Sequence, residues 1–209
     1  MEQNIQYGTP AHAQKILEGL EILYPDAGCA LNHLSALQLL IAVILSAQCT
    51  DVRVNIVTKD LFKKYRTAAD YANASQEELE TDIHSTGFYH NKAKNIRECC
   101  RILVEKYGGE VPDSMDELVQ LPGVGRKTAN CVLGTFWGIA DGVVVDTHVL
   151  RLAQRMGLSE ETTPEKVEQD LMRIVPQDKW VKISHQLILH GRNVCMARNP
   201  QCEKCLFND

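Results

Sequence analysis

The chain has 209 residues, of which 44% are hydrophobic and 23% charged, which is typical of a folded globular protein and unlike a disordered chain. Its longest apolar run, residues 37–45 interrupted by Gln38, is far shorter than the ~20 residues that a membrane-spanning helix needs. The formal net charge of -5 counts against a uniformly basic nucleic-acid-binding surface but allows a local one.

The N-terminal stretch MEQNIQYGTPAHAQ lacks the basic and apolar segments of a signal peptide, so a cytoplasmic location is expected. The eight cysteines are then expected to be reduced. Five of them are scattered along the chain and are predicted to be small buried or half-buried side chains: Cys29, Cys49, Cys99, Cys100 and Cys131.

Helical patterns follow one another along the chain. Helices are predicted over residues 11–24, 34–48, 51–65, 76–86, 91–109, 115–121 and 165–175. Ser75 with Glu78, and Ser114 with Glu117, have the spacing of capping boxes, and Thr163 precedes a proline at the start of the last of these helices. The short run GVVVD (142–146) is interpreted as a buried extended connector, so the predicted class is all-α.

The stretch DSMDELVQLPGVGRKTANCVLGTFWG (113–138) predicts two helices joined by a glycine turn. Pro122 ends the first helix, while Gly123 and Gly125 allow positive φ and leave backbone N–H groups unshielded. A second helix beginning near Arg126 would present its positive dipole end and its first N–H groups to an anion such as phosphate. On the glycines alone, a plain helical hairpin explains the pattern equally well.

Three cysteines near the end of the chain, Cys195, Cys202 and Cys205, have the spacing C-x6-C-x2-C. This spacing is typical of metal ligands, although a thiolate site usually has four. A zinc site and a redox pair of Cys202 and Cys205 are the alternatives, and neither accounts for Cys195.

Five segments resemble, in the same order, those of the endonuclease III family of helix-hairpin-helix DNA glycosylases. They are LLIAVILSAQCTD (39–51), STGFYHNKAKNI (85–96), LPGVGRKTA (121–129), VVVDTH (143–148) and LILHGRNVC (187–195). The resemblance covers about residues 30–205 and implies two helical lobes with a DNA-binding cleft between them. One lobe is a six-helix barrel over 29–139, with the helix-hairpin-helix at about 113–139. The other is a discontinuous helical domain of 1–28 and 140–209 that ends in an iron–sulfur cluster loop.

The same resemblance implies a bifunctional DNA glycosylase and abasic-site lyase of base excision repair. It would act as a monomer, associated with the nucleoid through DNA, on double-stranded DNA that carries an oxidised pyrimidine or an abasic site.

In the family, the lysine after GVGR attacks C1′ and the aspartate of VDTH is its partner; here these are Lys127 and Asp146. The helix dipole and partial burial would favour a neutral Lys127 amine, and a nearby Asp146 would oppose this. Asp146 is expected to cap a helix.

Further residues are expected to contact DNA because they match family positions. Gln48 and Phe88 stand where family residues enter the duplex after the damaged base has left it, and many relatives have leucine at the second place. The other expected contacts are Gly123, Val124, Gly125, Arg126, Thr128 and His148. Local basic residues are expected to contact phosphates: Lys92, Lys94, Arg97, Arg192, Arg198 and Lys204. Backbone carbonyls near Val119, Leu121 and Val124 are expected to hold a monovalent cation, as in relatives.

In the family the cysteine pattern is C-x6-C-x2-C-x5-C and holds one [4Fe–4S] cluster. Cys195, Cys202 and Cys205 would be three of its ligands, and the fourth cysteine is expected beyond Asp209. A shortened C-terminus and a natural loss or weakening of the cluster are both open. Without a cluster, residues 190–209 contain few apolar side chains and are expected to be loosely held.

Alternatives to this function stay open. Pyrimidine-dimer glycosylases and mismatch thymine or uracil glycosylases use the same scaffold, and the motifs do not set the choice of lesion. Adenine-excising mismatch glycosylases lack the lysine. A non-catalytic helix-hairpin-helix DNA-binding protein does not account for Lys127 and Asp146 together.

Overall fold

The computed structural model describes residues 8–208, and the secondary structure of this part is entirely helical, which confirms the predicted all-α class. The helices are α1 (Pro10–Leu23), α2 (Ala36–Ser46), α3 (Asp51–Lys64), α4 (Ala68–Asn73), α5 (Gln76–Ile83), α6 (Tyr89–Tyr107), α7 (Met115–Leu118), α8 (Arg126–Val132), α9 (Thr147–Arg155), α10 (Pro164–Ile174) and α11 (Trp180–Asn193). Shorter turns are η1 (His84–Thr86), the π-helical η2 (Leu133–Trp137), η3 (Gln177–Lys179) and η4 (Cys202–Lys204). Within residues 8–208, no helix is long and apolar enough to cross a membrane.

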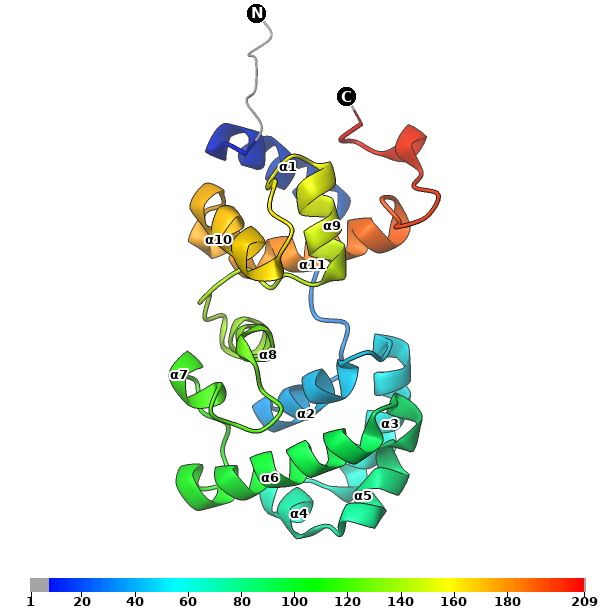
Figure 1. Ribbon diagram of the computed structural model, residues 1–209, viewed down its shortest axis with the longest axis vertical. Coiled ribbons are helices and arrows are strands. Elements are labelled where there is room, and N and C mark those ends of the chain that lie inside the picture. Colours follow the sequence, from blue (N-terminus) through cyan, green and yellow to red (C-terminus); the bar gives the residue numbers. More distant parts are fainter. Residues whose placement is uncertain (1–7, 209) are drawn as a thin grey trace, which may run out of the picture. The chain divides into compact units, whose positions relative to one another are not determined.

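The chain divides into two compact units. Unit 1 joins the stretch up to Gly28 to the stretch from Ala140 onward, and it contains α1, α9, α10 and α11 (Figure 1). Unit 2 is Cys29–Ile139 and contains α2 to α8. The chain therefore leaves unit 1 after α1, builds the whole of unit 2, and returns to unit 1 after η2.

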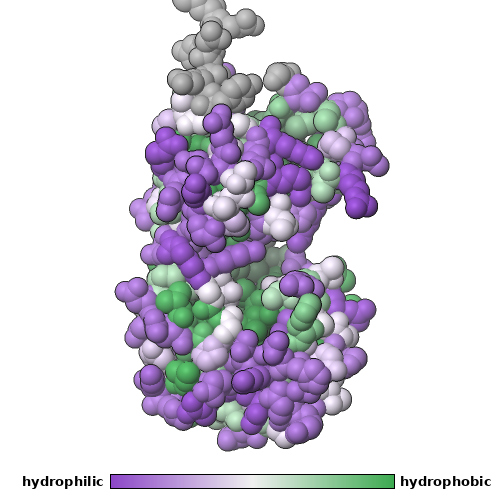
Figure 2. Space-filling view, viewed as in Figure 1, coloured by the Kyte–Doolittle hydropathy of each residue, from purple (hydrophilic) through white to green (hydrophobic). Residues whose placement is uncertain are grey.

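The core of unit 2 is built around α2. Its residues Leu39, Leu40, Ile41 and Leu45 are fully buried, and the helix contacts α3, α6 and α8. This burial agrees with a sequence that is apolar on nearly every face of the helix. Hydrophobic side chains also reach the surface of this unit around α7 and α8 (Figure 2), where Val119 is partly exposed.

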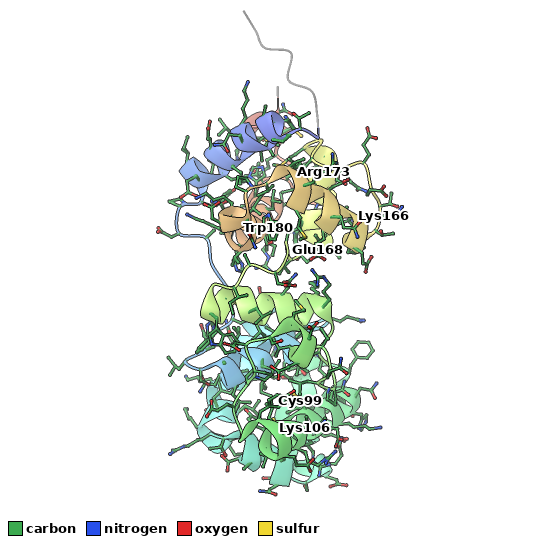
Figure 3. The ribbon with its side chains drawn as sticks, turned by 90° about the vertical axis from the view of Figure 1, so that its left-hand side faces the viewer. Cys99, Lys106, Lys166, Glu168, Arg173 and Trp180 are labelled. Carbon is green, nitrogen blue, oxygen red and sulfur yellow. The ribbon has the colours of Figure 1, made fainter. Side chains whose placement is uncertain are left out.

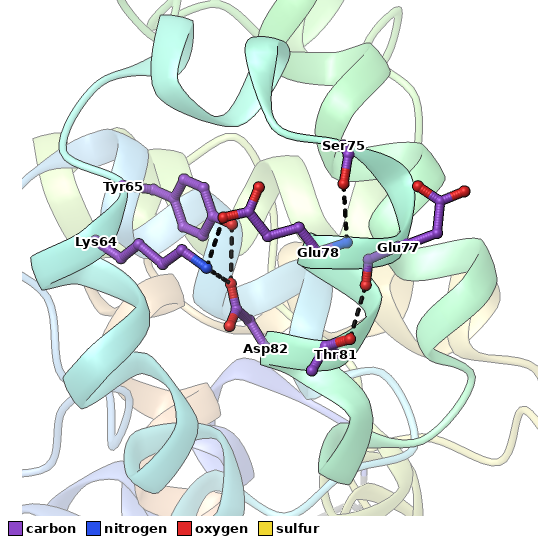
Figure 4. A network of polar contacts seen from close by, with 7 residues as sticks. All are labelled: Lys64, Tyr65, Ser75, Glu77, Glu78, Thr81 and Asp82. Atoms are coloured by element: carbon purple, nitrogen blue, oxygen red, sulfur yellow. Dashed lines mark hydrogen bonds and ion pairs between the residues drawn. The ribbon is translucent and has the colours of Figure 1, made fainter.

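Polar contacts join α3 to α5 (Figure 4). The Asp82 carboxylate accepts hydrogen bonds from Lys64 Nζ at 2.6 Å and from the Tyr65 hydroxyl at 2.8 Å. The Ser75 hydroxyl accepts from the backbone N–H of Glu78 at 3.1 Å, so Ser75 caps α5 as predicted. The predicted capping box is only half formed, because the Glu78 carboxylate pairs with Lys64 Nζ at 2.8 Å.

The capping box predicted for Ser114 is wrong. Ser114 stands at the N-cap of α7, but its side chain makes no capping hydrogen bond. The helix that follows it has only four residues, so there is little helix for a cap to stabilise. Thr163 likewise precedes α10 without a side-chain cap, although Pro164 occupies the first helical position as predicted.

The core of unit 1 is formed by apolar faces of α1, α9, α10 and α11. The predicted connector GVVVD contributes Val143 and Val145, which are buried in this core in an extended stretch with no strand partner among residues 8–208. This confirms its interpretation as a buried connector. It leads directly into Asp146 and α9.

Candidate active site and DNA-binding residues

The glycine turn between α7 and α8 is built as the sequence predicts. The N–H of Val124 donates to the carbonyl of Leu121 at 3.0 Å, and Gly123 has a φ of 80°. Proline followed by a glycine at positive φ is the usual content of a tight turn of this kind. Gly123 also lies close to α6, because a Cβ at this position would be 3.0 Å from the Cβ of Asn95. Glycine is therefore required here for both conformation and space.

The second helix of the hairpin begins at Arg126, with Gly125 as its N-cap, as predicted. Glycine has no side chain with which to cap the helix, so the N–H groups of the first turn have no acceptor from that side chain. Lys127 lies in this first turn and is exposed, as is Arg126, whereas Thr128 is half-buried. The amine of Lys127 is therefore not withdrawn from water, and the partial burial considered from the sequence is absent.

The catalytic aspartate candidate has a defined local role in unit 1. Asp146 is the N-cap of α9, and its Oδ1 accepts hydrogen bonds from the N–H groups of His148 and Val149, each at 2.8 Å. The sequence-based expectation that Asp146 caps a helix is confirmed. Lys127 belongs to unit 2 and Asp146 to unit 1.

His148 is held by Arg151 on the same helix. Arg151 Nη2 donates to His148 Nδ1 at 3.2 Å and also to the carbonyls of Gly191 at 3.0 Å and Cys195 at 3.1 Å. Burial is the main cause that lowers the pKa of His148, the cations Arg151 and Arg192 lower it further, and Asp146 opposes them.

Gln48 and Phe88 share an unusual backbone conformation. Three non-glycine residues of the described chain have positive φ, namely Gln48 (53°), Phe88 (49°) and Asn199 (51°). Asparagine tolerates this region, whereas glutamine and phenylalanine reach it at a cost of ~1–2 kcal/mol each. Both side chains are exposed, Phe88 by 63% of its surface. Strain of this kind is often kept at functional positions.

One of the predicted phosphate contacts is wrong. Lys92 is only 5% exposed, and its Nζ donates to the carbonyls of Leu45 and Thr86, each at 2.8 Å. Arg97 is also engaged inside unit 2, because its Nε donates to the carbonyl of Ala74 at 2.8 Å. Of this predicted basic group, Lys94 is the exposed member.

The C-terminal cysteines lie near His190 and α9. Cys205 Sγ is 3.5 Å from His190 Nε2, and Cys195 Sγ accepts from Arg155 Nη1 at 3.5 Å. Burial is the main cause that raises the pKa of Cys205, and the other two cysteines raise it further. Within residues 8–208, no group of three or more His, Cys, Asp or Glu side chains is arranged to hold a metal ion. Within the described residues these thiols therefore do not form a complete site for the four-thiolate cluster that the family resemblance implies.

The expectation that this segment is loosely held without a cluster stays a prediction, but one of its side chains makes a defined contact. Phe207 packs against the core of unit 1, with its ring centroid 5.3 Å from that of His190. A Cβ on Gly19 of α1 would be only 2.5 Å from the Phe207 ring, so the ring rests directly on that helix. The glycine of α1 makes room for this contact, which a count of apolar residues in the segment does not reveal.

Two residues that organise the α9 region, Arg151 and Gly191, were not among the predicted site residues. A Cβ on Gly191 would be 2.9 Å from Arg151 Nη2 and 3.1 Å from His148 Nδ1, so only glycine leaves room for them. The signal was present in LILHGRNVC, because a glycine in the middle of a helical pattern usually marks close packing. The burial of Lys92 was also predictable from the sequence, because Lys92 precedes Ile96 and Cys99 by four and seven residues on the buried stripe of α6.

Two helices joined by a glycine turn, with the second beginning at Arg126, form the helix-hairpin-helix arrangement that the sequence predicts. Residues 41–177 match the family model of the HhH-GPD superfamily of base excision DNA repair proteins. The sequence is 54% identical over 193 residues to endonuclease III of Synechocystis sp., and the matched stretch covers 92% of this chain and 88% of that protein. It is 47% identical over 190 residues to endonuclease III of Bacillus subtilis (strain 168), covering 90% and 86% of the two chains. The chain belongs to the endonuclease III family.

Solved structures agree with this assignment. A non-covalent complex of an endonuclease III with DNA has a TM-score of 0.91 and 48% identity, and covers 95% of this chain and 93% of that one. A thermostable thymine-DNA glycosylase shares the fold, with a TM-score of 0.80 at 22% identity.

Proposed function

We propose that the protein excises oxidised pyrimidines from double-stranded DNA and cuts the strand at the abasic site by attack of Lys127. The family assignment makes it a DNA glycosylase and abasic-site lyase of base excision repair. The observation that carries the proposed mechanism is an exposed lysine in the first turn of a helix that follows a glycine turn. A phosphate held at that helix start would bring the deoxyribose within reach of the amine.

The reaction has two stages. The neutral Nζ of Lys127 forms a bond to C1′ as the bond between C1′ and the base breaks, and the base leaves with the electron pair. Opening of the sugar then gives a Schiff base between Nζ and C1′. Loss of a proton from C2′ expels the 3′ phosphate and breaks the strand, after which water releases the amine.

Asp146 is proposed to stabilise the positive charge that develops at C1′. Its Oδ1 is fixed by the N–H groups of His148 and Val149, so the carboxylate is oriented before DNA binds. His148, held by Arg151, would contact the DNA backbone. These roles, like those of Gly123, Val124, Gly125, Arg126 and Thr128 at the hairpin, are proposals.

Gln48 and Phe88 are proposed to fill the space that the damaged base leaves in the duplex, because unstacking a base costs a few kcal/mol unless other groups replace its contacts. Both side chains are exposed and lie in unit 2. The aromatic ring of Phe88 would stack on a neighbouring base more broadly than an aliphatic side chain does. The monovalent cation at the hairpin, the cleft between lobes and the cytoplasmic location stay predictions.

Cys195, Cys202 and Cys205 are proposed to supply thiolates to the [4Fe–4S] cluster expected from the family. No step of the reaction above depends on that cluster. Visible absorption of the purified full-length protein, together with iron and acid-labile sulfide analysis, tests this. Protein without iron and sulfide would overturn it.

Borohydride trapping tests the role of Lys127. The parent protein is expected to form a covalent adduct with a thymine-glycol duplex when borohydride reduces the Schiff base, and Lys127→Ala is expected to form none. Lys106→Ala is the matched control, because Lys106 is an exposed lysine of α6 (Figure 3). An adduct at parental yield in Lys127→Ala would remove this residue from the role.

The choice of lesion needs a comparison of substrates. We expect thymine-glycol and abasic duplexes to be incised faster than duplexes with a pyrimidine dimer or a thymine mismatch. Preference for the dimer or the mismatch would move the protein to one of the related glycosylase activities. Tight duplex binding without incision of any substrate would favour a non-catalytic DNA-binding protein.

A further inference from the structure

Two strained turns of unit 2 carry the side chains proposed to enter the duplex. The first follows α2: the N–H of Cys49 donates to the carbonyl of Ser46 at 3.0 Å, and Gln48 occupies the third position of this turn with φ 53°. Glycine is the usual residue at that position. The second turn joins η1 to α6, where Gly87 (φ 70°) is followed by Phe88 (φ 49°) as N-cap. Each turn needs support from its surroundings to keep such a conformation.

One buried ammonium connects these two turns. Lys92 Nζ donates to the carbonyl of Leu45, three residues before Gln48, and to the carbonyl of Thr86, two residues before Phe88. Lys92 itself lies in the first turn of α6, and its N–H donates to the carbonyl of Phe88 at 3.1 Å. The side chain therefore spans from the helix that Phe88 opens to the end of the helix that Gln48 follows.

The chemistry of this arrangement explains why a lysine is buried. Leu45 lies in the last turn of α2 and Thr86 ends η1, so both carbonyls are at helix ends, where the backbone lacks its regular partners. An ammonium also interacts favourably with the negative end of a helix dipole. Burial lowers the pKa of Lys92, which means that the fold retains this group in spite of the loss of hydration.

We propose that Lys92 is a positioning residue that fixes the spacing of Gln48 and Phe88, so that both side chains enter the duplex together. This inference rests on the proposed function, because Lys92 can affect excision in this way only if Gln48 and Phe88 enter the duplex. Lys92 does not contact DNA in this role. Exact placement matters, since a displacement of about 1 Å can cost an enzyme on the order of 100-fold in rate.

The experiment compares two substrates in Lys92→Met and in the parent. Excision of thymine glycol from a duplex requires the vacated space to be filled, whereas borohydride trapping on a single-stranded abasic oligonucleotide needs only Lys127 and its surroundings. Lys92→Met is expected to slow duplex excision about 10- to 100-fold and to leave single-strand trapping within about twofold of the parent. Lys106→Met, on the exposed part of the same helix, is expected to change neither.

A double-mutant comparison tests whether Lys92 acts through the two side chains. In a Gln48→Ala, Phe88→Ala background, Lys92→Met is expected to slow duplex excision no further, because residues that act together are non-additive. An equal loss on both substrates, or full additivity in that background, would overturn the inference. If Lys92→Met does not fold, Lys92→Gln, whose amide can still donate to one carbonyl, takes its place in the same comparisons. A parent protein that forms no trapped adduct would instead overturn the proposed function, and this inference with it.

Discussion

The cysteines of unit 2 have different surroundings, although the sequence predicts the same buried or half-buried environment for all of them. A hydrogen bond from the thiol of Cys131 lowers the pKa of Cys29, whereas the pKa of Cys131 is raised by that bond and by burial. Burial raises the pKa of Cys99 to about 12. Cys131 lies one helical turn after Lys127, so this thiol pair adjoins the helix that carries the proposed nucleophile.

Alkylation should therefore distinguish these thiols. The thiolate is the reactive form, so iodoacetamide is expected to modify Cys29 with a pH midpoint at least about one unit below the ~8.5 of a free thiol. Cys131→Ala removes the hydrogen-bond donor and is expected to move this midpoint upward. Mass spectrometry of the peptides gives the extent of modification, with Cys99 as the unreactive internal control. A midpoint in Cys131→Ala equal to that of the parent would contradict the prediction.

Single residues also show where sequence reasoning succeeds and where it stops. Asp146 was predicted as a helix cap because the interaction is local and involves the next two or three residues. Lys92 was misjudged because its partners lie 47 and 6 residues away and are backbone carbonyls, which no side-chain pattern reveals. The strained backbone of Gln48 and Phe88 was equally hidden, since neither residue type favours positive φ.

Between elements, α9 and α11 pack closely because Gly191 has no side chain. The guanidinium of Arg151 occupies this space and bonds the carbonyls of Gly191 and Cys195. The sequence predicted α9 to begin at Asp146 and the cysteines to follow LILHGRNVC, but not that one arginine joins the two segments. Such contacts depend on tertiary packing, whereas caps and glycine turns depend on neighbours along the chain.

Gly191→Ala tests this packing. The sign of the change in the free energy of unfolding shows whether helix propensity or crowding by the added Cβ dominates. Helix propensity alone favours alanine over glycine by about 1 kcal/mol. The added Cβ would be 2.9 Å from Arg151 Nη2 and 3.1 Å from Leu152 Cδ1, so Arg151 must move and lose hydrogen bonds. We expect a net loss of about 1–2 kcal/mol in the free energy of unfolding, measured with urea. Gly28→Ala, where a Cβ meets nothing within 4 Å, is the control. A stabilised Gly191→Ala would show that α9 and α11 are not closely packed there.

At the scale of the whole molecule, three histidines of unit 1 have lowered pKa values. Burial lowers the pKa of His148, His185 and His190, all of which lie in unit 1. His190 is fully buried, with Nδ1 3.1 Å from the Tyr24 hydroxyl and Nε2 near Cys205. Protonation of these rings in the folded state is therefore unfavourable, so unit 1 is expected to lose stability in acid.

The direction of this response follows from proton linkage. A histidine whose pKa is lowered below the ordinary value of 6.5 binds its proton in the unfolded chain first, so unfolding takes up protons as the pH falls through that value. The free energy of unfolding then rises with pH, by up to about 1.4 kcal/mol per pH unit for each such proton. Stability is fully present above pH 6.5 and is lost below it.

The two tryptophans allow each unit to be followed separately. Trp180 lies in unit 1 (Figure 3) and Trp137 ends η2 in unit 2, so Trp137→Phe and Trp180→Phe each leave one fluorescent reporter. Between pH 7.5 and pH 5.5, we expect the Trp180 signal to report a fall of at least about 1 kcal/mol in the free energy of unfolding, and the Trp137 signal a smaller one. Urea titrations at the two pH values give both quantities. Equal falls at the two reporters would mean that the histidines of unit 1 do not set the acid sensitivity of the protein, whereas unequal falls would locate that sensitivity in the unit that carries Asp146 and the C-terminal cysteines.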